Sequence, residues 1–157
     1  MTPERTWVLL AYRIPREPST PRITGWRRLR QLGAVQLGDG LSALPCDDRT
    51  REQFEWLAQF VEDADGQASV WVAEPTTAAQ HREFAARMKA AVAADYRSVV
   101  DAAEAARHGN INRRRRSAAR LRRTLERIKS RDFFPPAERR HAERAVRELA
   151  TLVEAER

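Results

Sequence analysis

The chain has little cysteine, lysine or glycine, and it has no long uninterrupted apolar segment. Its single cysteine, Cys46, excludes an internal disulfide and suits a reducing compartment. The apolar runs are a few residues long, far short of a membrane span. The opening residues, MTPERTW, contain no signal-peptide core. From these absences we expect a soluble, cytoplasmic protein.

Sequence signatures of enzymes are also missing. There is no GxSxG, HExxH or P-loop motif, and the glycines stand where turns are expected. His81, His108 and His141 lie far apart, away from any cysteine or carboxylate cluster with metal-ligand spacing. We therefore expect no catalytic centre, metal or cofactor, and we interpret the three histidines as surface residues of helices.

The positive charge of the chain is concentrated in its second half. Residues 1–76 contain nine arginines against eleven acidic residues, whereas residues 77–157 contain twenty basic residues against eleven acidic ones. A GC-rich genome accounts for the scarcity of lysine, but codon bias does not gather charge in one half of a chain. The distribution therefore favours a polyanion as the partner of the second half.

Six segments in the first 75 residues alternate between the periodicities of strands and helices. The pattern predicts a strand, a helix, the two strands of a hairpin, a second helix and a fourth strand over residues 7–14, 20–32, 34–37, 41–44, 51–65 and 68–73. Thr50 and Gln53 have the spacing of a capping box for the second helix. This order predicts an α+β fold: a ferredoxin-like βαββαβ domain over residues 1–75, with both helices on one face of an antiparallel sheet.

Such a sheet leaves its second face uncovered. Trp7, Leu9 and Trp71 fall on that face, and exposed apolar residues of this size require a cover. A second subunit and the C-terminal half of the chain are both candidates, and we expect both to contribute.

Residues 76–157 have the pattern of a long helical extension. A first helix from Thr77 has one apolar stripe and ends at residues 108–110. Two later segments, separated by Phe133, Phe134 and two prolines, place apolar residues three and four positions apart. These are Ala118, Leu121, Leu125 and Ile128 in one segment, and Ala142, Val146, Leu149 and Val153 in the other. The two seams predict an antiparallel helical hairpin, although either seam could instead pair with another chain.

The densest basic cluster lies on the first arm of this hairpin. No acidic residue occurs between Asn110 and Thr124 to neutralise it locally. Contact with nucleic-acid phosphates is one interpretation, and a solvated helix face neutralised by acids of another helix is the alternative. The candidate DNA-binding residues are Arg113, Arg114, Arg115, Arg116, Arg120, Arg123 and Arg127.

A second, smaller group of arginines follows the first strand. Arg13 and Arg16 flank the expected N-terminus of a helix, where two guanidinium groups form a candidate site for an oxyanion such as phosphate or chromate. Structural pairing of these arginines with Glu17 or Asp39 is the alternative.

Three segments, YRIPREPSTPR, GWRRLRQLGAVQLGDGLSALP and DRTREQFEWLA, resemble the N-terminal region of the chromate resistance regulator family ChrB. The resemblance extends loosely through the helical half, and it implies a transcriptional regulator of chromate efflux. The βαββαβ segment is also similar to the central domain of PaaX-type repressors and to the small CRISPR-associated nuclease subunit of the spacer-integration complex.

The chain departs from these families in two places. Longer ChrB proteins carry a C-terminal domain associated with the chromate response, and nothing in this chain corresponds to it. The CRISPR-associated proteins carry a metal-binding aspartate where this chain has Ala11, Tyr12 and Arg13. Because an arginine repels a divalent cation, a metal-dependent nuclease is not expected.

These observations predict a homodimeric, DNA-binding transcriptional regulator linked to chromate or oxyanion resistance. The alternative is a non-catalytic protein–protein interaction module of a chromate resistance system, in which the helical seams dock onto another protein and no DNA is bound.

Overall fold

The computed structural model describes residues 1–156, and the chain divides into two compact units, Met1–Arg87 and Met88–Arg157. The first unit is a four-stranded antiparallel sheet with two interleaved helices, and the second is built from long helices. The α+β class predicted from the sequence is confirmed at this level.

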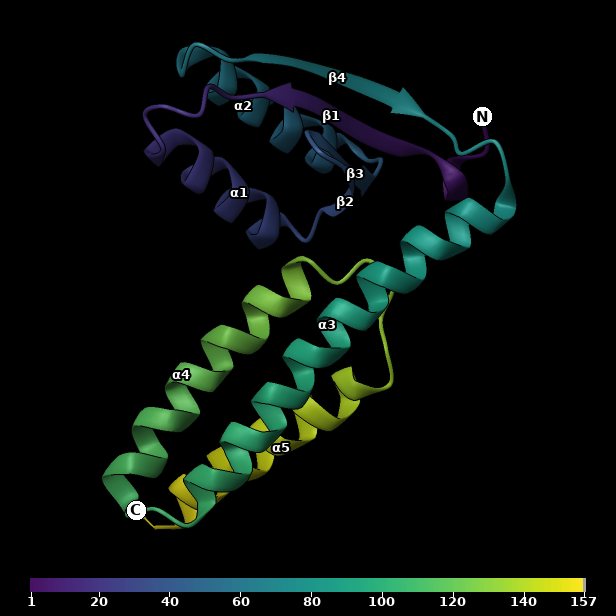
Figure 1. Ribbon diagram of the computed structural model, residues 1–157. Helices are drawn as coiled ribbons and strands as arrows, with labels where there is room; N and C mark the ends of the chain where they lie inside the picture. Colours follow the sequence, from purple (N-terminus) through teal and green to yellow (C-terminus); the bar gives the residue numbers. More distant parts are fainter. Residues whose placement is uncertain (157) are drawn as a thin grey trace. The chain divides into compact units, whose positions relative to one another are not determined.

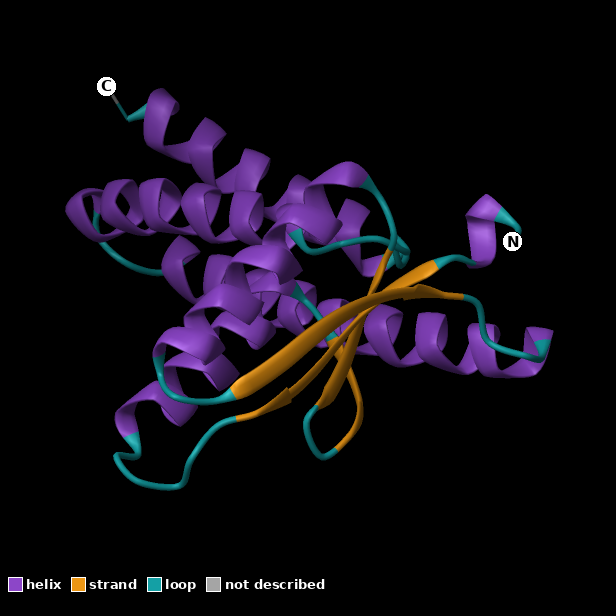
Figure 2. Cartoon of the chain, turned by 90° about the horizontal axis from the view of Figure 1, so that it is seen from above, coloured by secondary structure: helices purple, strands orange, loops and turns teal. Residues whose placement is uncertain are grey.

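The first unit follows the predicted βαββαβ order. After a short 3-10 turn at Pro3–Arg5, its elements are β1 (Trp7–Arg13), α1 (Thr20–Leu32), β2 (Val35–Gly38), β3 (Leu41–Pro45), α2 (Asp48–Asp63) and β4 (Gln67–Ala73). The strands lie in the order β2-β3-β1-β4, with α1 and α2 together on one side of the sheet. Figure 2 shows the twist of the four strands, drawn in orange.

One face of the sheet forms the core of this unit. Val8 and Leu10 of β1 and Leu44 of β3 are fully buried on it. Helix α2 contributes Phe54, Leu57 and Val61 to the core, at the three- and four-residue spacings of a single helix face. Because β1 pairs on both sides, with β3 and with β4, it is a central strand, which agrees with its apolar residues on both faces.

The N-terminus of α2 is capped differently from our prediction. Asp47 is the N-cap residue, and its Oδ1 accepts the Thr50 N–H at 2.7 Å. The Thr50 hydroxyl in turn accepts the Asp47 N–H at 2.9 Å, which completes a reciprocal capping box. The predicted box of Thr50 and Gln53 is therefore wrong, because the helix begins before Thr50, and this residue serves as the third position instead.

The second face of the sheet is covered in part by helix α3 (Ala78–Arg107). Trp7, for which we expected a cover, is only 2% exposed. Its ring contacts the rings of His81 and Phe84 edge-on, and its Nε1 donates to His81 Nδ1 at 3.1 Å. The prediction that the C-terminal half covers this face is thus confirmed at Trp7. Trp71 remains 59% exposed.

The second unit is a helical bundle with its own core. Helices α4 (Ile111–Ser130) and α5 (Glu138–Ala155) form the predicted hairpin, and the later part of α3 packs with them. The buried cluster contains Val92, Tyr96, Val99, Ala103, Ala106, Leu121, Leu125, Ile128, Ala142, Val146 and Leu149. Both predicted seams therefore pack within their own chain.

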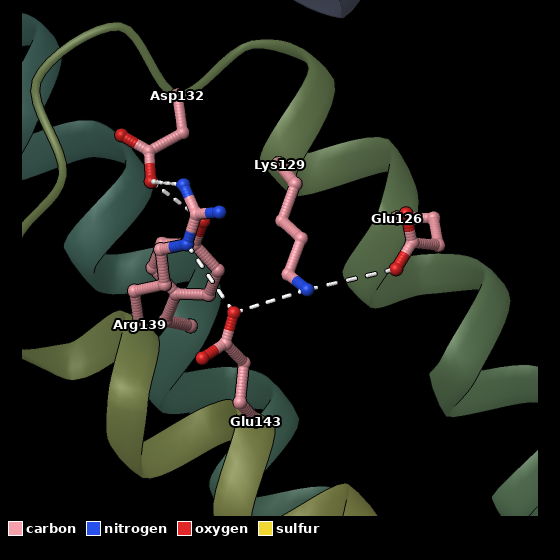
Figure 3. A network of polar contacts seen from close by, with 6 residues as sticks. Glu126, Lys129, Asp132, Arg139 and Glu143 are labelled. Carbon is pink, nitrogen blue, oxygen red and sulfur yellow. Dashed lines mark hydrogen bonds and ion pairs between the residues drawn. The ribbon is translucent and has the colours of Figure 1, made fainter.

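Polar contacts join the three helices where α4 ends and α5 begins (Figure 3). The Tyr96 hydroxyl donates to Asp132 Oδ2 at 2.7 Å, and Arg139 Nη1 donates to the same oxygen at 3.4 Å. Glu143 then accepts from Arg139 at 3.3 Å and pairs with Lys129 at 3.0 Å.

None of the helices within residues 1–156 has the length and apolar composition that a membrane span requires.

Candidate nucleic-acid interface

The candidate interface is built on helix α4, whose start is set by Asn110. The side chain of Asn110 caps the helix by accepting the Arg113 N–H at 2.9 Å. The buried seam of Ser117, Leu121 and Leu125 sets the phase of the helix, because these residues face the core. The phase in turn decides which arginines point toward solvent.

Five arginines form one exposed stripe along α4, which we call the arginine face. Its members are Arg113, Arg116, Arg120, Arg123 and Arg127. They follow one another at spacings of three and four residues, so that each guanidinium group stands about one helical turn, ~5 Å, from the next. None of the five forms an ion pair with any residue that the structure describes. The alternative of a face neutralised by acids of another helix finds no support in the ion pairs of this part of the chain.

The first four members of the arginine face line a groove between α3 and α4. This arginine groove has a volume of about 740 Å³. Its remaining lining consists of small residues, namely Ala102, Ala105, Ala106, Ser117 and Ala119. Because alanine side chains leave room beside α4, the guanidinium groups can reach a ligand laid along the groove without displacing other side chains. No acidic residue is among those lining it.

The placement of these charges opposes the stability of the helix. Helix α4 has no acidic residue in its first turn, where Arg113 lies, and Arg114–Arg116 follow directly. Positive charges near a helix N-terminus interact unfavourably with the macrodipole, and like charges at four-residue spacing repel one another. Each effect costs a few tenths of a kcal/mol, so these exposed arginines do not stabilise the helix.

Arg114 does not belong to this surface, although we predicted it as a DNA-binding residue. Its Nη1 forms an ion pair with Glu156, and its Nε donates to the carbonyl oxygen of Arg107 at 3.0 Å. Its side chain is only 22% exposed. Arg114 precedes Ser117 by three residues and Leu121 by seven, so the helical period already placed it on the buried seam.

The other predicted arginine, Arg115, is exposed but lies on a different side of α4. It does not line the arginine groove, and Arg127 continues the stripe beyond the groove's lining. The structure thus brings four of the seven predicted residues into one groove. The alanines that shape the groove were not predicted as site residues, and only their helical spacing at positions 102, 105 and 106 could have indicated a groove wall.

The first unit contains a separate basic pocket. Arg13 and Arg16, the candidate oxyanion-binding residues, line it together with Arg22, which follows on α1. The pocket has a volume of about 1140 Å³ and also includes Ser19 and Asp39. Within the described residues neither Arg13 nor Arg16 is ion-paired, to Glu17 or to Asp39.

The turn before β3 closes one side of this basic pocket. Gly40 lines the pocket and adopts a φ of 71°, and its carbonyl oxygen accepts the Tyr12 N–H at 2.8 Å. A side chain at Gly40 would collide with the Tyr12 carbonyl group. Burial raises the pKa of the Tyr12 hydroxyl, so the phenol stays neutral beside the arginines at physiological pH. Oxyanion binding at this pocket stays a prediction.

Comparison with known proteins identifies the family. Residues 22–156 match the model of the family described as Protein ChrB, N-terminal. The chain belongs to this family. Protein ChrB of Cupriavidus metallidurans is 32% identical over 100 residues, which are 64% of this chain and 27% of that relative. The match to this ChrB protein therefore spans about a quarter of its length.

No solved structure matches the chain. The matched region of the ChrB N-terminal family runs from α1 through α5 and so includes the whole of the arginine face. The resemblance read from the three sequence segments is confirmed.

Proposed function

We propose that the chain binds DNA as part of a transcriptional regulator in chromate or oxyanion resistance. The arginine face of α4 contacts backbone phosphates, with Arg113, Arg116, Arg120 and Arg123 acting through the arginine groove. The observation that carries this proposal is a continuous row of exposed guanidinium groups, free of ion pairs with the described residues, beside a wall of alanines.

Phosphate contact suits this arrangement better than recognition of an acidic protein surface. The row repeats at an almost constant interval along one helix, as the phosphates of a nucleic-acid strand do along its backbone. Arginine offers several donors to each phosphate and remains charged at any physiological pH. Such contacts give affinity and position without sequence specificity, so any recognition of a DNA sequence requires contacts to the bases.

The test is a DNA titration across a salt series. The operon's own upstream DNA, labelled with a fluorophore, is titrated by anisotropy with the wild-type chain and with R116A/R120A/R123A. We expect the triple variant to bind more weakly and its log–log salt slope to fall by about 3, since each lost phosphate contact removes ~0.9 from the slope.

A matched control removes the same charge from another helix. R140A/R144A/R147A deletes three exposed arginines of α5, which are also spaced at four and three residues and are not ion-paired within the described residues. This variant should keep most of the wild-type slope. Equal losses in both variants would mean that only the total charge matters. Absence of binding by the wild type at low salt would reject DNA binding and leave the protein–protein interaction module.

A further inference from the structure

Strand β4 forms one edge of the sheet, and its outer side has no neighbouring strand. All seven residues pair with β1, from Gln67 opposite Arg13 to Ala73 opposite Trp7. The order β2-β3-β1-β4 leaves the other side of β4 without a partner strand among the described residues (Figure 1). In an antiparallel edge strand, alternate residues direct their N–H and C=O groups away from the sheet, where another strand can accept them.

The opposite edge of the sheet is protected against such pairing. Strand β2 has only four residues, and its register with β3 shifts between Gln36 and Gly38. Arg87 also reaches this edge and donates to the carbonyl oxygen of Gln36 at 2.6 Å. A short strand, an irregular register and a basic side chain at the edge are the usual means by which sheets avoid edge-to-edge association.

Strand β4 has none of these protections. Its sequence, QASVWVA, contains no charged residue and no proline, and its register with β1 is regular throughout. Trp71 and Val72 are 59% and 41% exposed, and as successive strand residues they lie on opposite faces of the sheet. The edge is therefore apolar on both faces and has the composition of a strand that is paired on both sides.

We infer that β4 pairs antiparallel with β4 of a second copy of this chain, which joins two four-stranded sheets into one of eight strands. Antiparallel pairing of a strand with its own copy has two-fold symmetry, so every contact is made twice. Centred on Val70, the pairing sets Val70 opposite its own copy and Ser69 opposite Trp71 of the other chain.

A second copy suits this edge better than an unrelated strand for two reasons. An uncharged strand meets no electrostatic repulsion from its own copy. The exposed apolar residues on each face also lie beside the same apolar residues of the other chain. The two Trp71 side chains become diagonal neighbours across the symmetry axis, a separation of ~7–8 Å that aromatic rings can bridge. This inference concerns the first unit alone and does not depend on DNA binding by α4.

Sedimentation equilibrium over a concentration series tests the inference with two lysine variants. Ser69→Lys puts a charge on the exposed β4 edge, and Gln36→Lys puts the same charge on the exposed β2 edge as the control. We expect a wild-type dimer whose Kd rises at least tenfold in S69K and is unchanged in Q36K. A wild-type chain that stays monomeric at all concentrations overturns the inference, as does a dimer that S69K leaves intact.

Cross-linking supplies a second measurement that does not rely on a charged substitution. In a C46S background, which removes the chain's single cysteine, V70C should form a disulfide-linked dimer on mild oxidation, since opposite residues of paired strands lie within disulfide range. C46S/Q36C should remain a monomer on a denaturing gel. Failure of V70C to cross-link, or linkage of Q36C instead, overturns the pairing centred on Val70.

Discussion

Asp132 shows how the second unit accommodates a buried charge. The side chain of Asp132 is fully buried, and so is Tyr96, whose hydroxyl group donates to it. Burial raises the pKa of Tyr96, and the hydrogen bond to Asp132 raises it further, so that the phenol remains a donor. An isolated buried carboxylate would cost several kcal/mol, and the bonds from Tyr96 and Arg139 to Oδ2 offset part of this cost. The contacts therefore tie α3 and the start of α5 to the segment between α4 and α5.

Because of Glu143, we expect the stability of this unit to fall at acid pH. The pKa of Glu143 is lowered, first by the hydrogen bond from Lys129 and then by that from Arg139. A carboxyl whose pKa is lower in the folded state stabilises the fold above its unfolded value, ~4.3, and this stabilisation is lost as the pH falls through the folded pKa. We expect urea midpoints to fall below pH ~4.3 in the wild type and to fall less steeply in Glu143→Gln.

The control for this pH series is Glu126→Gln. Glu126 also pairs with Lys129, at 3.6 Å, but its side chain is 68% exposed. Its removal should leave the acid dependence as in the wild type. An identical pH profile for Glu143→Gln and the wild type would show that the Lys129 and Arg139 contacts do not stabilise the folded state.

At the scale of elements, helix α4 both packs into the bundle and presents a row of exposed arginines. The helical period places its buried seam and its arginine face on different sides of the helix. The spacing of Leu121 and Leu125 indicates which side is buried. Arg114 lies on the side of the buried seam and is held by Glu156 and by the Arg107 carbonyl group. Neighbouring arginines in one run therefore differ: Arg114 makes contacts within the fold, whereas the arginine face is exposed.

This difference predicts effects of different size for substitutions at adjacent positions. Arg114→Ala should lower the free energy of unfolding by about 1 kcal/mol, because it removes a mostly buried side chain with two polar contacts. Arg115→Ala, at an exposed position without an ion pair to the described residues, should change it by less than ~0.5 kcal/mol. Urea unfolding followed by far-UV circular dichroism measures both. Equal effects would contradict the inward position of Arg114.

At the scale of the whole molecule, the chain contains two separate hydrophobic cores. The core of the first unit combines the sheet with α1 and α2, whereas the buried cluster of the second unit comes entirely from α3, α4 and α5. Helix α3 takes part in both, because His81 and Phe84 contact Trp7 while Val92 and later residues enter the bundle. The boundary between the two compact units falls within this helix, between Arg87 and Met88. The division into domains at residues 75 and 76 stays a prediction.

A fragment of residues 78–157 should fold without the sheet, since it contains the whole bundle core and the arginine groove. We expect a helical circular dichroism spectrum with cooperative thermal unfolding. If the bundle carries the phosphate contacts, anisotropy titrations of the fragment should give the salt slope of the full chain. A markedly smaller slope would show that the first unit contributes contacts of its own, and an unfolded fragment would show that the bundle needs the sheet.

Much of the fold and part of the site could be predicted from local patterns. The strand of residues 7–13, the helices and both seams follow from periods of two and 3.6 residues, which local sequence expresses directly. The cap of α2 was mispredicted because Asp47 and Thr50, three residues apart, are both suitable N-cap residues. The groove beside α4 was missed because it depends on Ala102 and Ala106, which are distant in sequence from the arginines.

The amino-acid sequence by itself determined the element order, the concentration of arginine on one helix and the family. Each of these is local or compositional, and none requires knowing which elements meet. Only the tertiary structure decided that α3 covers Trp7, that the seams pack within one chain, that Arg114 is held by Glu156, and that β4 rather than β2 presents an open edge. These outcomes depend on contacts between residues far apart in the chain, whose partners no periodicity specifies.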